Sequence, residues 1–251
     1  MVVSLDEIIE VQTEYGPIHF RGHDTGRPIL LFITGAFAQV DQLHRVPERF
    51  PEMDVLRAHL PGNHCPPLVG VSIDLYASAF SAALDDRFKG RDVIVVGLSV
   101  GAVVALGLRA SRVREIIALE PILVTDEAWP LKVLLNQAQP GQEAFLWNVL
   151  GIGPEGPVRR DYRYVLEGLQ VPVCAMLGEE PPPERPWSGA MPGMVGTLAR
   201  AALAAHPRVW TRHVRGVGHN IVRDAGEAVL KTIHPAIVRT FGVDVAKMDL
   251  S

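Results

Sequence analysis

Short apolar runs recur along the chain and indicate strands. Four of them are continuous rather than alternating, which is typical of parallel strands buried on both faces: they cover residues 29–33, 92–96, 115–119 and 171–177. Two shorter segments, 8–13 and 17–21, flank Tyr15-Gly16 and predict a hairpin. Residues 53–59 form a less regular strand candidate, and 208–214 form the last strand.

Segments with helical character lie between these runs. Ser72 is placed to cap a helix that ends near Gly90, and further helices are expected from Gln39 and over residues 102–110 and 194–205. A closing helix covers 224–241, in which Pro235 predicts a kink or a restart. Strands alternating with helices predict an α/β fold: a single domain over residues 1–251 with a mostly parallel sheet covered on both faces.

The regular pattern weakens over residues 122–170, where aromatic residues stand among prolines and glycines. An insertion of this length between two predicted strands is typical of a lid. We therefore expect a lid, or cap, over about 122–170, between the strands at 115–119 and 171–177.

Composition narrows the choice of partner. The chain has 251 residues, of which 48% are hydrophobic and 21% charged, and its formal net charge is −4. Its basic residues are scattered, so nucleic acid or an anionic membrane is not expected, whereas a small-molecule partner is. The first residues resemble no signal peptide, and no run reaches the roughly 18 apolar residues of a membrane span. Cys65 and Cys174 give no disulfide framework or metal-binding spacing, so a cytoplasmic protein is expected.

A Gly-x-Ser-x-Gly motif follows the strand predicted at 92–96. It comprises Gly97, Ser99 and Gly101, and a small-residue helix begins directly after it. Such a strand–turn–helix junction is a nucleophile elbow, where glycines remove the Cβ atoms that would clash in a sharp turn. The pattern predicts that the Ser99 hydroxyl is exposed at the carboxyl edge of the sheet.

Other residues with suitable chemistry also follow predicted strands directly. Because the carboxyl ends of parallel strands share one edge of a sheet, these residues are expected to gather there. They are Gly35-Ala36, Ser99, Glu120, Glu179-Glu180 and His219.

In this ordered set of motifs the chain resembles the α/β-hydrolase superfamily, over nearly its whole length apart from the lid. The motifs are, in order, the hairpin, a strand ending in Thr34-Gly35, the Leu60-Pro61-Gly62 loop, the elbow, a variable insertion, acidic residues behind a strand, and a late Gly216-Val217-Gly218-His219.

The resemblance implies roles for four residues. Ser99 is the nucleophile, His219 is its general base, and the backbone N–H groups of Val100 and Ala36 form the oxyanion hole. Many relatives have His-Gly where this chain has Thr34-Gly35, so the packing of that loop is expected to differ while the main-chain donors remain.

The acid that supports His219 has two candidates. The family commonly places it three residues past the glycine that ends the strand after the lid, but counting from Gly178 gives Pro181, which has no carboxylate. Glu180 lies one residue earlier. Glu120, at the end of the preceding strand, occupies a position that some branches of the superfamily use. We prefer Glu120 because Glu180 also fits a solvated turn, and we keep Glu180 as the alternative, together with the interpretation that neither pairs with His219.

Several neighbouring residues have a structural interpretation beside a functional one. His59 and His64 lie near the expected pocket, where loop packing is the preferred interpretation, and Cys65 is interpreted as a spectator. Three aromatic residues of the lid fit either an apolar acyl site or the small core of the lid itself; they are Trp129, Phe145 and Trp147.

The resemblance implies a serine hydrolase that acts through an acyl-enzyme on Ser99, with no metal or organic cofactor. The expected substrate is a carboxylic ester, thioester or amide of a small hydrophobic compound. Two other interpretations remain open: an acyltransferase or lyase that uses the same triad, and a non-catalytic homologue that binds a ligand. The sequence leaves the oligomeric state open.

Overall fold

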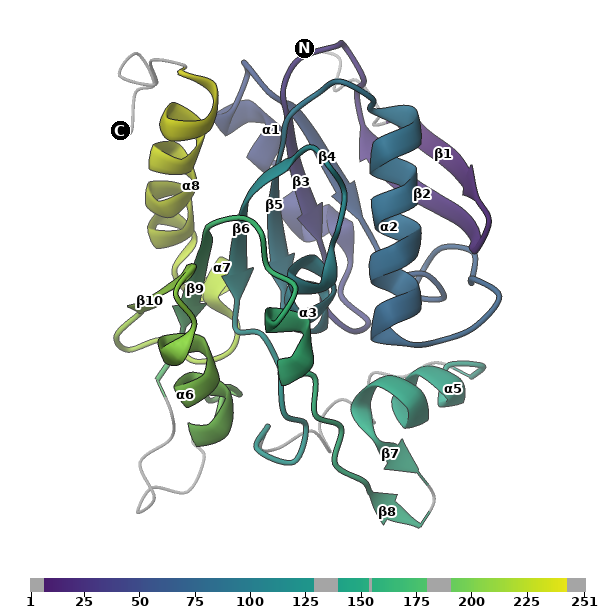
Figure 1. The fold of residues 1–251 in the computed structure, drawn as a ribbon, viewed down its shortest axis with the longest axis vertical. Helices are drawn as coiled ribbons and strands as arrows, with labels where there is room; N and C mark the ends of the chain where they lie inside the picture. Colours follow the sequence, from purple (N-terminus) through teal and green to yellow (C-terminus); the bar gives the residue numbers. More distant parts are fainter. Residues whose placement is uncertain (1–6, 129–139, 154, 180–190, 243–251) are drawn as a thin grey trace.

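A mostly parallel sheet runs through the centre of the protein (Figure 1). The structure is a computed structural model and describes residues 7–128, 140–153, 155–179 and 191–242. Over these residues, eight strands form one sheet in the order β1-β2-β4-β3-β5-β6-β9-β10. They are β1 (Glu7–Thr13), β2 (Gly16–Gly22), β3 (Ile29–Ile33), β4 (Asp54–Ala58), β5 (Val93–Leu98), β6 (Val113–Leu119), β9 (Val173–Leu177) and β10 (Val209–His213).

The apolar runs of the sequence occupy the middle of this sheet. β1 pairs with β2, and β2 with β4, in antiparallel fashion, while the remaining neighbours are parallel. All of β3 is buried, and so is β5 apart from its last residue, because both faces of these strands are covered. The four predicted core strands are confirmed, each with boundaries within two residues of those expected.

Helices cover both faces of the sheet, as expected. α2 (Ile73–Arg87), α3 (Val100–Gly107) and α6 (Thr197–Ala205) pack on one face, where their apolar residues join a single core cluster. α7 (Ile221–Asp224) and α8 (Gly226–Phe241) pack on the other face. The predicted cap of α2 is present, since the Ser72 Oγ accepts a hydrogen bond from the Leu75 N–H at 3.1 Å.

The helix expected from Gln39 is much shorter than a full helix. It consists of a 3-10 turn, η1 (Val40–Leu43), and a single turn of α-helix, α1 (Val46–Arg49). The prolines explain the difference, because Pro51 drives the preceding Phe50 out of the α region, to φ −138° and ψ 61°.

The closing helix differs from expectation in the place where it restarts. α8 continues through Pro235 without a break. The interruption lies instead at Ala225, with φ −145°, between α7 and α8. The prediction of a restart at Pro235 is therefore wrong, because packing of the apolar face of α8 on the sheet outweighs the one backbone hydrogen bond that proline cannot donate.

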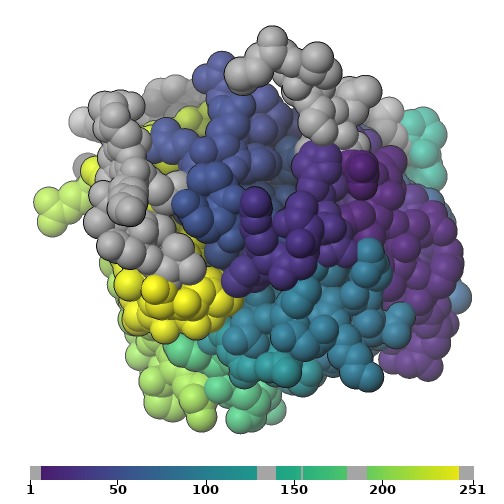
Figure 2. Space-filling view, turned by 90° about the horizontal axis from the view of Figure 1, so that it is seen from above, coloured from purple at the N-terminus to yellow at the C-terminus, as the bar shows by residue number. Residues whose placement is uncertain are grey.

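The inserted region 122–170 contains short elements at the carboxyl ends of the parallel strands (Figure 1). They are α5 (Glu143–Phe145), the π-helical turn η2 (Leu146–Leu150), β7 (Ile152–Gly153), β8 (Gly156–Pro157) and the 3-10 turn η3 (Arg163–Leu166). Figure 2 shows the opposite end of the molecule, where α2 lies beside the N-terminal strands β1 and β2. We call 122–170 the cap.

Candidate active site

Ser99 stands on a strained turn between β5 and α3. Its backbone has φ 56° and ψ −118°, a region that side chains rarely occupy. The flanking glycines are required by space: a Cβ on Gly97 would lie 2.5 Å from the Cα of Ala102, and a Cβ on Gly101 would lie 2.3 Å from the backbone oxygen of Thr34. The backbone here therefore has the shape of the predicted elbow, with Ser99 only partly buried at the carboxyl edge of the sheet.

His219 brings an imidazole to this serine from the loop after β10. Its Nε2 lies 3.1 Å from the Ser99 Oγ, across 120 residues of sequence. Its backbone N–H donates to the Met191 oxygen at 3.1 Å, and Gly218 before it passes so close to Met191 that a Cβ would lie 1.9 Å from the same oxygen. This close approach holds the loop, and the imidazole is 10% exposed.

Glu120 supports the other side of the imidazole. It follows β6 directly, with φ 51°, and its Oε2 lies 3.2 Å from the His219 Nδ1. The carboxylate is 1% exposed and accepts two backbone hydrogen bonds, one from Gly178 at 2.7 Å and one from Met194 at 2.6 Å. These donors satisfy both oxygens of the buried carboxylate and fix its orientation towards the imidazole.

The structure brings Ser99, His219 and Glu120 into one hydrogen-bonded series. Glu180, the alternative acid, lies outside the described residues, and the neighbouring Glu179 is exposed. Sequence reasoning missed the backbone donors Gly178 and Met194, because a main-chain N–H leaves no signal in the residue pattern. The glycine directly after β9 was the one indication of a close approach, since a Cβ on Gly178 would lie 2.4 Å from the Gly218 backbone oxygen, in the loop that carries His219.

Two backbone N–H groups near the Ser99 hydroxyl have the character expected of an oxyanion hole. Gly35 lies against Ser99, since a Cβ there would be 3.0 Å from the Ser99 Cβ, and Ala36 follows it. Val100 is the first residue of α3, so its N–H has no acceptor within the helix. Within the described ranges, neither Ala36 nor Val100 donates a backbone hydrogen bond, so both N–H groups are available to a ligand.

Aromatic side chains of the cap reach this edge unequally. Phe145 is buried, with its ring 5.3 Å from that of Phe37, directly after Ala36, and 6.4 Å from that of Tyr76. Trp147 is 41% exposed, and its ring packs against the Arg160 guanidinium. Trp129 lies outside the described residues.

The loop after β4 places its polar residues against the turn that follows β3, residues 35–40. We call it the oxyanion turn, after the role expected of the Ala36 N–H. His59 is buried and His64 lies beside it, with 5.2 Å between the ring centroids. The Cys65 thiol donates to the Leu60 backbone oxygen at 3.4 Å, and burial raises the pKa of this thiol to about 11. A thiol with so high a pKa is a poor nucleophile at neutral pH, in line with a spectator role.

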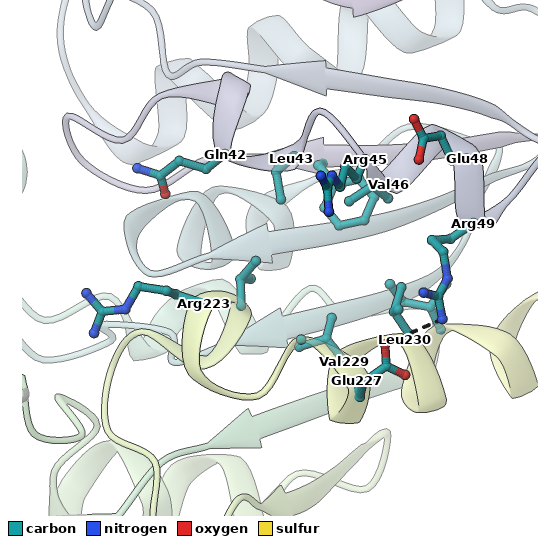
Figure 3. A pocket seen from close by; sticks show the side chains of 14 residues that line it. Gln42, Leu43, Arg45, Val46, Glu48, Arg49, Arg223, Glu227, Val229 and Leu230 are labelled. Atoms are coloured by element: carbon teal, nitrogen blue, oxygen red, sulfur yellow. Dashed lines mark hydrogen bonds and ion pairs between the residues drawn. The ribbon is translucent and has the colours of Figure 1, made fainter. Parts of the chain in front are cut away.

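A cavity of about 510 Å³ opens elsewhere, between the η1–α1 segment and helices α7 and α8 (Figure 3). Apolar side chains such as Val229 and Ile233 line it together with charged ones such as Arg49 and Glu227, and the Arg49 Nη2 lies 3.4 Å from the Glu227 Oε1. Ser99, Glu120 and His219 do not line it, so this cavity is separate from the candidate active site.

Within the described part of the chain, no group of three or more His, Cys, Asp or Glu side chains is placed to hold a metal ion. No helix there combines the length and the apolar character that crossing a membrane requires.

Solved structures with the same arrangement of strands and helices are α/β-hydrolases. A carboxylesterase from Bacillus subtilis matches with a TM-score of 0.66 at 16% identity, over 92% of this chain and 91% of its own. An N-acyl homoserine lactonase in complex with N-hexanoyl homoserine matches with a TM-score of 0.67 at 17% identity, over 95% and 98% of the two chains. A thermophilic esterase from Thermogutta terrifontis matches with a TM-score of 0.65 at 15% identity, over 93% of this chain and 99% of its own.

By sequence alone, no protein-family model and no curated protein matches the chain. The similarity is therefore one of architecture, and it extends over nearly the full length of the compared chains. The sheet order, the helices on both faces and the strained serine turn after β5 agree with it. The protein has the α/β-hydrolase fold.

Proposed function

We propose that the protein is a serine hydrolase that cleaves a carboxylic ester, thioester or amide through an acyl-enzyme on Ser99. The observation that carries the proposal is the series of contacts from the Ser99 Oγ through both ring nitrogens of His219 to the Glu120 carboxylate. A serine hydroxyl is a weak nucleophile until a base removes its proton, and the base needs a partner that sets its tautomer.

The proton positions follow from the contacts. An ionised Glu120 only accepts hydrogen bonds, so the His219 Nδ1 carries the proton and Nε2 is left free to accept the proton of the Ser99 hydroxyl. As Oγ attacks the carbonyl carbon, Nε2 takes this proton and later gives it to the leaving group. Glu120 stabilises the imidazolium that forms between these steps.

The negative charge of the tetrahedral intermediate needs donors. The N–H groups of Val100 and Ala36 are the candidates, because neither has another backbone partner within the described residues. Val100 also begins α3, where the helix dipole favours negative charge. Water then attacks the acyl-enzyme, and His219 acts as base for the second time.

The expected substrate is small and hydrophobic. Phe37 directly follows Ala36, and the rings of Phe145 and Tyr76 extend the same apolar cluster into the cap. An acyl chain beside this cluster would bury its apolar surface away from water. The esterases and the lactonase of similar fold support acyl chemistry as a class, while the acyl group itself is the finer proposal.

Labelling with a fluorophosphonate tests the nucleophile. Wild-type protein should be modified once, Ser99→Ala should not be labelled, and Ser111→Ala, which removes an exposed hydroxyl, should be labelled like the wild type. A wild-type protein that neither reacts nor hydrolyses any ester would rule out catalysis and leave the ligand-binding interpretation.

A series of p-nitrophenyl esters of increasing acyl length then locates the acyl preference. Adding an alcohol to the same assay separates hydrolysis from acyl transfer, because a transferase would form the new ester faster than the free acid. Formation of acid alone would support the hydrolase.

A further inference from the structure

Two imidazoles hold the oxyanion turn, and neither touches Ser99. The Val40 N–H donates to the His59 Nε2 at 3.1 Å, and the His64 Nε2 lies 3.2 Å from the Phe37 backbone oxygen. Both histidines come from the chain that follows β4, whereas the turn follows the neighbouring strand β3. The two contacts thus flank the residues directly after Ala36.

We propose that His59 and His64 are positioning residues that keep the Ala36 N–H directed at the developing oxyanion. The inference rests on the proposed function, because it assigns a role within the same reaction. It concerns side chains outside the Ser99, His219 and Glu120 series.

The turn needs such support because its backbone is strained. Phe37 has φ 56°, in the left-handed region that a bulky side chain seldom occupies. Residues in such conformations persist where the surroundings over-determine them. The Phe37 backbone oxygen is held by His64, the Val40 N–H is held by His59, and the Phe37 ring lies against Phe145.

The two contacts require different protonation at the two rings. A backbone N–H can only donate, so the His59 Nε2 must be an unprotonated acceptor and the proton of its neutral ring sits on Nδ1. A carbonyl can only accept, so the His64 Nε2 donates in this contact, and its Nδ1 is left to accept from the Gln39 side-chain amide at 3.1 Å. His59 is 5% exposed, which favours the neutral ring that the contact needs.

The Val40 contact can be removed from either side. Val40 is the first residue of η1, and the preceding Gln39 has φ −87° and ψ 136°, the extended conformation that a residue before proline adopts. Val40→Pro therefore deletes the N–H without forcing the backbone, and Val40→Ala keeps the N–H while shortening the side chain. On the other side, His59→Leu removes the acceptor, and His59→Gln offers an amide oxygen in its place.

The experiment measures kcat and KM for a p-nitrophenyl ester in these four variants, with thermal unfolding to confirm the fold of each. We expect His59→Leu to lower kcat by roughly 10- to 100-fold with KM within about 2-fold, because a displaced oxyanion donor weakens the transition state more than the bound substrate. His59→Gln should recover most of the loss, and Val40→Pro should fall well below Val40→Ala.

A double-mutant cycle separates the hydrogen bond from general packing. Val40→Pro added to His59→Leu should cost little more than either change alone, since both remove the same contact. Multiplying effects, or full kcat in a folded His59→Leu protein, would overturn the inference. Failure of the proposed function is distinct, because the wild type itself would then show neither turnover nor labelling of Ser99.

Discussion

The Glu120 carboxylate lies against the His219 imidazole, with Oε2 3.2 Å from Nδ1, although the residues are 99 positions apart. The contact joins the end of β6 to the loop after β10, and β9 lies between these strands in the sheet. The carboxylate reaches across the end of β9 and accepts the Gly178 N–H on the way. Both the orientation of His219 and the path of the chain after β9 therefore depend on one side chain.

Glu120→Gln should lower kcat roughly 10²- to 10⁴-fold, because the amide no longer stabilises the imidazolium and can impose the wrong tautomer. Steady-state kinetics with a p-nitrophenyl ester measure the change. Glu179→Gln, at an exposed position, is the matched control, and Glu180→Gln tests the alternative acid. Full turnover in both Glu120→Gln and Glu180→Gln would contradict any triad built on these acids.

Ser99→Gly should abolish activity and raise the free energy of unfolding by about 1 kcal/mol. The backbone at φ 56° and ψ −118° suits glycine, and relief of strain exceeds the extra entropy that glycine gives the unfolded chain. Ser99→Ala keeps a Cβ, so it should lose activity without this gain. Urea unfolding of both variants provides the comparison, and equal stability would mean that the turn stores no strain.

Gly101→Ala should destabilise the protein by about 3 kcal/mol or prevent folding, because the new Cβ meets the backbone oxygens of Thr34 at 2.3 Å and Ile33 at 2.5 Å. Both oxygens belong to the end of the central strand β3, whose backbone cannot move aside cheaply. Gly226→Ala is the control, since a Cβ there meets no described atom within 4 Å. Urea unfolding of the pair checks the difference, and a similar small effect in both would refute the steric argument.

The free energy of unfolding should fall as the pH drops from about 6.5 to about 4, partly because of His59. The pKa of His59 is lowered from 6.5 to about 4, mainly by burial. The positive charges of His64 and Arg21 also lower it, whereas the negative charge of Asp41 acts in the opposite direction. Between these values the unfolded chain holds a proton that the folded chain lacks, so acid favours unfolding.

His59→Gln removes this titration and should flatten the pH dependence over that window. His44→Gln, at an exposed histidine, should leave the slope unchanged. Urea titrations at several pH values measure both slopes. An unchanged slope in His59→Gln would show that the ring titrates alike in both states.

The sequence was most informative where one side-chain property decides the structure. Continuous apolar runs can only be buried, so the strands of the sheet centre were predictable, and the glycines around Ser99 indicated a turn too tight for a Cβ. The length of the helix after Gln39 could not be predicted, because Pro51 and the packing of the turn end the helix earlier than its residue pattern indicates. The cap consists of short elements, including a π-helical turn, and its apolar residues recur with neither a helical nor a strand period.

For the candidate site, residue order pointed to Ser99 and His219 but left the acid open. The reason is physical: Glu120 faces His219 because two backbone N–H groups, 58 and 74 residues further along the chain, donate hydrogen bonds to its carboxylate oxygens. The contacts of His59 and His64 with the oxyanion turn could not be predicted from the sequence either. They depend on the directions of a backbone N–H and a backbone carbonyl, which only the fold determines. The catalytic roles of all these residues stay predictions.

The Glu120 carboxylate ties together parts of the chain that are distant in sequence. One oxygen accepts the Gly178 N–H, and the other accepts the Met194 N–H and lies 3.2 Å from the His219 imidazole. The Gly193 N–H donates to the Glu179 backbone oxygen at 2.8 Å beside these contacts. Loss of this one side chain would therefore release two backbone segments as well as the imidazole, so chemistry and local architecture fail together at Glu120.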